Sequence, residues 1–385
     1  MDTITSKLRT YEEINDRIAK GEAVVVTAEE VINLVEDEGA RRAAREVDVV
    51  TTGTFSPMCS SGVFLNFGHA DPPIRMQKIW LNDVPAHGGL AAVDTYLGAT
   101  NLSETAPDYG GAHVIEDLVR GREVTLKAVS GGTDCYPRKE VTTDITLLSI
   151  NEAVMFNPRN CYQNYNAAVN TTKKTIRTYM GTLLPDMGNV SFATSGQLSP
   201  LFNDPTFRSI GMGTRIFLCG AQGHIAWHGT QHRPSVVERD GKTIIGGATL
   251  SVVGDLKKMS ADFLRAAVFP GYGVSMFVGI GIPIPILDEE MLRATAVTDD
   301  ELYTQIIDYS YPHRQRPALG TVSYGELRSG TVTLDGKEIR TSPLSSYAKA
   351  REIAQTLKKE IEESQFLLQR PAWTLPREGV NNHLE

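Results

Sequence analysis

The segment from Ala266 to Leu287 carries no charged residue, and it constrains the fold more than any other part of the chain. It is long enough to span a bilayer as a helix, but three prolines and four glycines interrupt it. Proline breaks a helix, and a bilayer accepts only backbone whose hydrogen bonds are satisfied within the protein. We therefore predict buried strands and turns here. Residues 1–20 lack the apolar core of a signal peptide, so a cytoplasmic protein is expected.

The composition is that of a globular chain. Its 385 residues, 41% of them hydrophobic, can bury one large core or two smaller ones. The formal charge of -8 argues against nucleic acid or an anionic membrane as a partner, because both attract basic surfaces. Four scattered cysteines are too few for a disulfide framework, so we expect a reducing compartment and free thiols.

Local patterns predict helices near both ends of the chain and short strands between them. Thr27 and Glu30 form a capping box at the start of one helix. Apolar residues spaced three and four apart predict another helix from about Tyr347 to Ile361. The Asp-Gly pairs at 240–241 and 335–336 each separate two β-branched runs, which predicts two hairpins.

These elements together predict an α/β fold class, with mixed layered sheets, flanking helices and β-hairpins. Residues 1–290 are expected to form a main catalytic body, and residues 291–385 a C-terminal segment that packs on it. The break between them is weak, so a single domain is the alternative.

Two cysteines lie in polar loops and are candidate nucleophiles. Cys59 precedes Ser-Ser-Gly, a turn whose free backbone N–H groups can hold an anion. Cys135 lies in the glycine-rich loop 131–139, where two nearby cations favour an ionised sulfur, the nucleophilic form of cysteine. The alternative for each is a small buried hydrophobic residue, but polar loops are poor places to bury an inert thiol. Cys219 is expected in the core, and Cys161 is a bystander or a supporting residue.

Residues 156–166 are rich in side-chain amides. A solvated turn explains this composition as well as a substrate site does, because asparagine favours turns. If the segment binds substrate, its amides are candidate donors to an oxyanion, and arginine is suited to a carboxylate. The candidate oxyanion donors are Asn157, Asn160 and Asn164. The candidate carboxylate partners are Arg159 and, in the loop that carries Cys135, Arg138.

Three histidines spaced four apart, His224, His228 and His232, raise the question of a metal site. On a helix such residues can share an ion, but on a strand they lie about 13 Å apart. The flanking glycines favour strand and turn, so we predict no metal and keep His232 as a candidate acid–base or substrate-binding residue. The chain also lacks Cys-x-x-Cys spacing and a complete G-x-G-x-x-G, so no zinc, iron–sulfur cluster or nicotinamide is expected in it.

Several longer sequence motifs are more specific than these general patterns. They are FLNFGH at 64–69, IWLNDVP at 79–85, GTDCYPRKE at 132–140, FNPRN at 156–160, GTLLP at 181–185 and GTQH at 229–232. Together they closely resemble the homocysteine biosynthesis family, once called domain of unknown function 39. The resemblance runs from about the first predicted helix to the last.

This resemblance implies a sulfurtransferase that inserts sulfur into L-aspartate semialdehyde to give L-homocysteine, in the methionine biosynthesis of certain anaerobes. Two sulfur-handling cysteines of the family match Cys59 and Cys135, one to carry a persulfide and the other to resolve it, in an order that stays open. The resemblance also implies a small ferredoxin-like iron–sulfur partner as the source of electrons. The sulfur donor is open, and a homodimer is one option. The account requires the two thiols to meet in one cleft.

Two other functions remain open at this point. A thiol redox sensor or sulfur carrier would use Cys59 and Cys135 as a regulatory pair. A CoA-transferase-like acyl transferase is suggested by the short phrase at 279–283, GIGIP, which is similar to one in that class.

Overall fold

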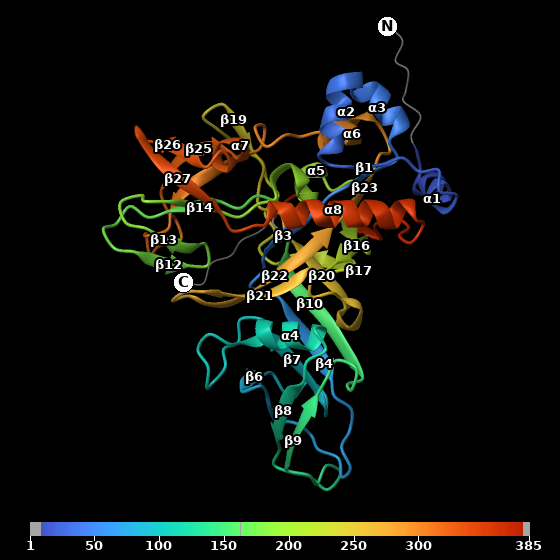
Figure 1. Ribbon diagram of the computed structural model, residues 1–385, viewed down its shortest axis with the longest axis vertical. Helices are drawn as coiled ribbons and strands as arrows, with labels where there is room; N and C mark the ends of the chain where they lie inside the picture. The colour runs from blue at the N-terminus through green and yellow to red at the C-terminus, as the bar shows by residue number, and fades with distance from the viewer. Residues whose placement is uncertain (1–8, 162, 380–385) are drawn as a thin grey trace.

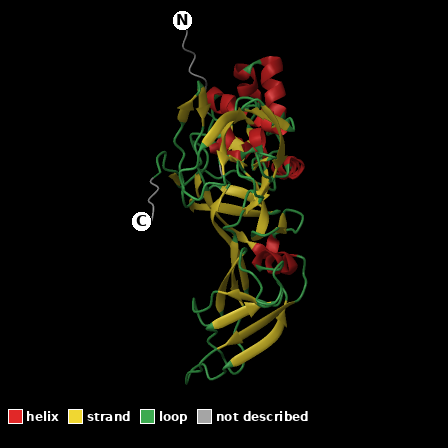
Figure 2. Ribbon diagram, turned by 90° about the vertical axis from the view of Figure 1, so that its left-hand side faces the viewer, coloured by secondary structure: helices red, strands yellow, loops and turns green. Residues whose placement is uncertain are grey.

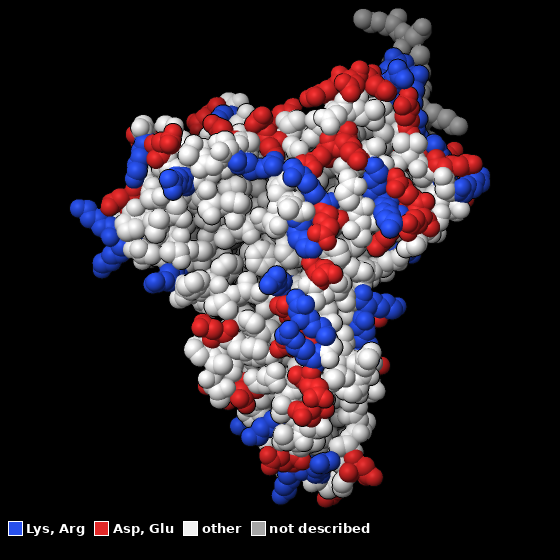
Figure 3. All heavy atoms as spheres, in the orientation of Figure 1, with Lys and Arg blue, Asp and Glu red and all other residues white. Residues whose placement is uncertain are grey.

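The computed structural model describes residues 9–161 and 163–379. Figures 1 and 2 show an elongated molecule, with a wide body that holds most of the helices and a narrow arm that extends from it. In this described part of the chain, no helix is long and apolar enough to cross a membrane. Figure 3 shows acidic and basic residues interspersed over the visible face, without a continuous basic area.

The body is built on a nine-stranded sheet. Its main path runs β21-β22-β16-β17-β20-β10-β4-β7, and β3 pairs with β22 beside it. The strands are β3 (Thr54–Pro57), β4 (Gly62–Asn66), β7 (Asp94–Gly98), β10 (Glu152–Asn160), β16 (Arg215–Leu218), β17 (Ala221–His228), β20 (Leu250–Asp255), β21 (Leu264–Phe269) and β22 (Gly273–Gly281). β3 pairs with β22 directly before the polar loop that carries Cys59.

The uncharged segment forms strands and a turn, as predicted. It supplies an inner strand and part of an edge strand of this sheet, and one strand of a separate three-stranded sheet. It forms the second half of β21, all of β22, and β23, and β22 is almost wholly buried. Two glycines of β22 let the helix α8 approach closely, since a Cβ at Gly279 or Gly281 would lie 3.0 Å from Ile353. The phrase that resembled a CoA-transferase therefore lies in the packed core. α8 spans Tyr347–Glu362, and β23 spans Pro283–Pro285.

A second sheet of six strands, in the order β25-β24-β11-β14-β27-β26, has its own hydrophobic core. Its members are β11 (Ala167–Val169), β14 (Val190–Phe192), β24 (Tyr303–Asp308), β25 (Ala318–Ser323), β26 (Thr331–Leu334) and β27 (Lys337–Pro343). Two of these strands precede residue 290 and four follow it. The boundary expected near residue 290 therefore does not separate two cores, because this sheet joins strands from both sides of it.

The helix caps and the hairpin turns predicted from the sequence are present in the structure. Thr27 and Glu30 exchange the two hydrogen bonds of a capping box, and the Ser346 hydroxyl caps α8. Both central residues of each Asp-Gly turn have positive φ, as a type I′ hairpin requires.

The remaining elements complete the body. The helices are α1 (Tyr11–Ala19), α2 (Glu30–Glu38), α3 (Ala40–Glu46), α5 (Pro200–Asn203), α6 (Glu289–Thr295) and α7 (Tyr324–Arg328), with 3-10 turns η1 (Gly196–Leu198) and η2 (Leu256–Lys258). The strands are β1 (Val25–Thr27), β2 (Val49–Thr51), β12 (Ile176–Thr178), β13 (Gly181–Leu183), β15 (Gly211–Met212), β18 (Val237–Arg239), β19 (Lys242–Ile244) and β28 (Trp373–Thr374).

The arm is a four-stranded sheet in the order β6-β5-β8-β9, with α4 at its junction with the body. The elements are β5 (Lys78–Leu81), β6 (Val84–Ala86), α4 (Gly111–Val119), β8 (Val124–Val129) and β9 (Glu140–Ile145). α4 contacts β21 and β22 of the body as well as β8 of the arm. Arm residues such as Leu126 and body residues such as Ile280 belong to one continuous hydrophobic core.

Candidate active site

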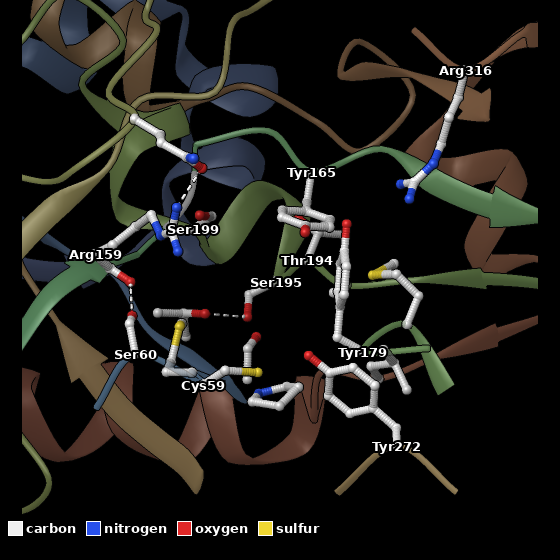
Figure 4. A pocket seen from close by; sticks show the side chains of 18 of the residues that line it. Cys59, Ser60, Arg159, Tyr165, Tyr179, Thr194, Ser195, Ser199, Tyr272 and Arg316 are labelled. Carbon is white, nitrogen blue, oxygen red and sulfur yellow. Dashed lines mark hydrogen bonds between the residues drawn. The ribbon is translucent and has the colours of Figure 1, made fainter. Parts of the chain in front are cut away.

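A cavity of about 500 Å3 opens where β3 meets the six-stranded sheet, and Cys59 lies on its wall (Figure 4). Eight segments of the chain, at 54–60, 159–165, 179–180, 193–199, 231, 272, 314–316 and 344, contribute to it. Its polar and aromatic lining includes Thr54, Ser56, Cys59, Ser60, Arg159, Tyr165, Tyr179, Thr194, Ser195, Gln231, Tyr272, Arg314 and Arg316. None of the described residues that line this cavity is acidic. The site therefore combines a half-buried thiol, several hydroxyls and unopposed positive charge.

The turn that carries Cys59 is anchored to the central strand β22. The backbone N–H of Met58 donates to the carbonyl of Met276 at 2.7 Å, and the Ser61 N–H closes the turn on the Met58 carbonyl at 3.1 Å. The Cys59 sulfur then lies 3.3 Å from the hydroxyl of Ser275, a fully buried residue of β22. The thiol is thus held in place by an inner strand of the sheet.

Asn157 braces the same turn from β10. It is fully buried, and its side-chain N–H donates to the Ser61 hydroxyl at 2.7 Å. Its side-chain oxygen accepts from the Ser60 hydroxyl and from the Arg159 backbone N–H, both at 2.8 Å. Both ends of the amide are therefore used within the protein. Asn157 does not line the cavity, and the structure gives it a supporting position rather than the substrate contact expected from the sequence.

Arg159 is the predicted carboxylate partner that the structure places beside Cys59. The Ser60 hydroxyl oxygen lies 2.7 Å from the Arg159 carbonyl, so its single proton is shared between this carbonyl and the Asn157 oxygen, which ties the two segments together. The guanidinium reaches the cavity and donates to the side-chain oxygen of Gln231. In the described part of the chain, Arg159 has no acidic partner, so its charge is available to an anionic ligand.

Tyrosines line the cavity beyond the thiol. The Tyr179 ring lies 6.1 Å from that of Tyr272 and 5.7 Å from that of Tyr309, and its hydroxyl donates to the Tyr309 hydroxyl at 3.2 Å. Burial, with the nearby Cys59 and Tyr179, raises the pKa of Tyr272 above its usual value. The Tyr272 phenol therefore keeps its proton at neutral pH and can donate a hydrogen bond.

The structure does not bring Cys135 to Cys59, and this corrects the expectation that both thiols line one cleft. β8 begins beside α4, where Asn82 links Thr125 to Tyr109. It extends about 17 Å from α4, and Cys135 is exposed in the loop that joins β8 to β9. Figure 1 shows this loop at the lower end of the arm. The cavity has no lining residue from that loop. The predicted carboxylate partner Arg138 shares the loop and is equally remote from Cys59.

Two of the candidate asparagines, Asn164 and Asn160, bond to other parts of the protein and lie outside the cavity wall. The amide of Asn164 donates to the carbonyls of Ile245 and Tyr303, while its oxygen accepts from the hydroxyl of Tyr324. Asn160 is fully buried, and its side-chain oxygen accepts from the N–H of Cys161. Neither amide lines the cavity.

His232 likewise has a supporting position and does not line the cavity. Its two ring nitrogens lie 3.0 Å from the carbonyls of Thr249 and Pro376, and it is buried outside the cavity. The neighbouring Gln231 takes the place in the cavity wall that the sequence suggested for His232.

The other two histidines of the series and the other two cysteines lie on β17 or in the core. His224 and His228 lie on β17 as expected, but the chain turns after β17 and brings the His228 and His232 rings to 5.6 Å. No described group of three or more His, Cys, Asp or Glu is arranged to hold a metal ion. Cys161 and Cys219 are buried, and burial raises the pKa of both thiols to about 12.

Several cavity residues had no usable signal in the sequence. Tyr179 and Tyr272 are ordinary turn residues, and Arg316 lies in an exposed polar loop. Ser275, which contacts Cys59 from behind the cavity wall, is an ordinary strand residue. Only their arrangement in space relates them to Cys59. By contrast, Gln231 lies in GTQH at 229–232, a motif already identified in the sequence.

The comparisons with known proteins agree on one family. A sequence model described as "Homocysteine biosynthesis enzyme, sulfur-incorporation" matches residues 23–368. The L-aspartate semialdehyde sulfurtransferase of Methanosarcina acetivorans is 54% identical over 372 residues, which are 96% of this chain and 73% of that protein. The protein of the same name from Methanocaldococcus jannaschii is 53% identical over 386 residues, with 96% and 74% covered.

A more distant relative is an uncharacterized protein of Methanothermobacter thermautotrophicus. It is 29% identical over 338 residues, which are 84% of this chain and 73% of that protein. No solved structure matches the chain.

Proposed function

Since the chain belongs to the homocysteine biosynthesis family of sulfur-incorporating enzymes, we propose that it converts L-aspartate semialdehyde to L-homocysteine with Cys59 as the sulfur carrier. The observation that carries this proposal is the Cys59 thiol on the wall of a cavity that also contains the unopposed guanidinium of Arg159. The thiol supplies a nucleophile, and the guanidinium supplies a partner for the carboxylate of the substrate.

The electron balance of the reaction determines how much external reductant it requires. An aldehyde and hydrogen sulfide give a thiol and water only if two electrons and two protons are added. Sulfur that arrives as sulfane sulfur needs two more of each. The proposed route therefore includes an external reductant, and a small iron–sulfur protein of the ferredoxin class meets that need.

The first steps follow from the geometry around Cys59. A persulfide on Cys59 places a nucleophilic terminal sulfur in the cavity, and that sulfur adds to the aldehyde carbon. The carbonyl oxygen gains a proton, and the cavity hydroxyls stabilise the developing charge by hydrogen bonds. Tyr272 is suited to donate, because its raised pKa keeps the phenol protonated. Reductive cleavage of the S–S bond and of the C–O bond then consumes the four electrons.

Cys135 takes part in this proposal as the second sulfur-handling thiol. The continuous core between arm and body keeps it away from the Cys59 of its own chain. We therefore place its exchange with Cys59 between two copies of the chain, in a homodimer whose arm reaches the cavity of its partner. Disulfide formation between them would release the sulfur at the level of sulfide and leave a bond for the external reductant to open.

The decisive experiment supplies the purified chain with L-aspartate semialdehyde, a labelled sulfur donor and a low-potential reductant. We expect labelled homocysteine from the wild type, none from Cys59→Ser, and the label on the Cys59 peptide when the aldehyde is withheld. Cys161→Ser is the matched control, because this buried thiol lies outside the cavity. Sulfur loading without any homocysteine would instead indicate a sulfur carrier or redox sensor. Homocysteine from Cys59→Ser would refute the proposal.

A further inference from the structure

The cavity beside Cys59 is much larger than the proposed substrate. Its volume of about 500 Å3 falls in the range of pockets that hold drug-sized ligands. At about 1.5 Å per C–C bond, the aldehyde and carboxylate carbons of L-aspartate semialdehyde lie at most about 4 Å apart. With its aldehyde at Cys59 and its carboxylate at Arg159, the substrate occupies one end of the cavity and leaves the other open.

The other end is formed by the loop between β24 and β25, which contributes Arg314 and Arg316. The Arg316 guanidinium carbon lies 4.3 Å from the centre of the Tyr309 ring, and Nε lies 3.4 Å from the Tyr311 carbonyl. Stacking and this contact hold the cation in place. Figure 4 shows Arg316 across the cavity from Cys59, beyond the tyrosine side chains.

The positive charge at this end has no acidic counterpart among the described residues. In residues 9–161 and 163–379, neither Arg314 nor Arg316 forms an ion pair, and the cavity lining contains no Asp or Glu. A guanidinium does not lose its charge in a protein, so two of them facing one cavity attract an anion. Figure 4 shows tyrosine rings between Cys59 and Arg316, so a substrate that contacts both Cys59 and Arg159 lies on the other side of these rings from Arg316.

We propose that Arg314 and Arg316 form a second anion subsite, which holds the sulfur donor on its way to Cys59. The donor is then a small anion that contains sulfane sulfur, of which thiosulfate and polysulfide are the simplest sources. This inference rests on the proposed function, because it assigns the origin of the sulfur that Cys59 carries.

The loading step balances without an added oxidant or reductant. The Cys59 thiolate attacks the sulfane sulfur, a new S–S bond forms at Cys59, and the S–S bond of the donor breaks. The departing group keeps the bonding electron pair. With thiosulfate, the products are the Cys59 persulfide anion and sulfite, and with polysulfide they are the persulfide and a chain one sulfur shorter.

Binding is tested apart from reaction in the full-length Cys59→Ala chain, which cannot accept sulfur. Calorimetric titration with thiosulfate should give a Kd at least tenfold higher when Arg316→Gln is added, and an intermediate Kd with Arg316→Lys. Arg265→Gln is the control, because it makes the same charge change on an exposed residue of β21 outside the cavity. Equal affinity in the Arg316 and Arg265 variants would overturn the subsite.

Loading is tested in the chain that retains Cys59, by mass spectrometry of the Cys59 peptide after exposure to thiosulfate or, in a separate arm, to tetrasulfide. We expect Arg316→Gln to slow loading at least tenfold with one of the anions, which identifies the donor class. Unchanged loading in both arms, or loading of the wild type by neither anion, would overturn this inference and leave the proposed function standing. Homocysteine formation in a wild type whose Cys59 never gains sulfur would overturn the proposed function itself.

Discussion

The sulfur of Cys59 lies 3.3 Å from the hydroxyl of Ser275, and the two residues are separated by 216 positions in the sequence. Ser275 is fully buried on β22, so its hydroxyl has a fixed direction. A hydroxyl at this distance donates to the sulfur when the thiol ionises. The reactive end of the turn is therefore held by a residue that does not itself line the cavity.

Ser275→Ala should slow alkylation of Cys59 and homocysteine formation by about two- to tenfold, the equivalent of a hydrogen bond of about 0.5–1.5 kcal/mol. The rates of iodoacetamide labelling and of turnover at fixed pH measure the effect. Ser251→Ala is a matched control, since it removes a buried serine hydroxyl from β20. Equal rates in the two variants would show that the Ser275 hydroxyl does not act on the sulfur.

Asn157→Ala should weaken both folding and activity. It leaves the Ser61 hydroxyl and the Arg159 N–H without their buried partner, and an unsatisfied buried group costs about 1–3 kcal/mol. Denaturant unfolding should show a free energy of unfolding lower by about 2 kcal/mol or more. Asn157→Asp keeps the acceptor for Ser60 and Arg159, so it should retain more activity than the alanine variant. The reverse order would contradict the supporting position assigned to Asn157.

Arg159→Gln should raise the KM for L-aspartate semialdehyde by about ten- to a hundredfold, because a charge-assisted hydrogen bond contributes about 1.5–3 kcal/mol. Arg138→Gln should leave this KM unchanged, because Arg138 lies on the arm and bonds the Glu140 carbonyl. Steady-state kinetics of the two variants distinguish the two carboxylate partners that the sequence offered. A raised KM in Arg138→Gln alone would reverse the assignment.

The buried thiols should make stability depend on alkaline pH. Burial raises the pKa of Cys161 and Cys219 to about 12, from about 9 for an exposed thiol. Below pH 9 both the folded and the unfolded chain keep these protons. Between pH 9 and 12 the unfolded chain loses them first, so folding stability falls as pH rises.

Unfolding free energies measured across that window should fall less steeply in Cys161→Ala than in the wild type. Iodoacetamide at pH 8 should label Cys59 and Cys135 in the folded chain, and Cys161 and Cys219 only after unfolding. Rapid labelling of Cys161 in the native protein would contradict its burial.

Oxidative cross-linking should join Cys59 to Cys135 only between two chains. A disulfide needs Cα atoms within about 7 Å, and the arm holds Cys135 away from the cavity of its own chain. Non-reducing electrophoresis followed by peptide mapping separates the two cases. A monomer that contains the Cys59–Cys135 link would show that the arm moves.

A complementation experiment tests, by measuring homocysteine formation, whether Cys59 of one chain acts with Cys135 of another. An equal mixture of Cys59→Ala and Cys135→Ala chains should regain homocysteine formation if the thiols act between copies, because each mixed pair contains one intact set. Each variant alone serves as the control. A mixture as inactive as its components would remove Cys135 from the proposed exchange.

The sequence alone determined the elements that depend on a few neighbouring residues. The capping box of Thr27 and Glu30, the Asp-Gly hairpins and the buried strand β22 follow from local backbone chemistry, which acts over three or four positions. Cys59 was identified for the same reason, since the serines and glycine beside it define its turn. The family resemblance likewise came from contiguous phrases.

The tertiary structure alone decided which of these residues meet. Asn157 and His232 have the chemistry of site residues, but packing directs their polar atoms into the framework. Cys135 has the loop of a reactive thiol but lies at the end of an arm. Ser275 and Arg316 enter the site only because strands and loops far apart in the sequence pack around one cavity. The spacing of neighbouring residues determines whether a segment forms a helix, a strand or a turn. The position of that segment in the molecule depends on the sum of many contacts between residues far apart in the sequence. A site built from several such segments therefore depends on the tertiary structure.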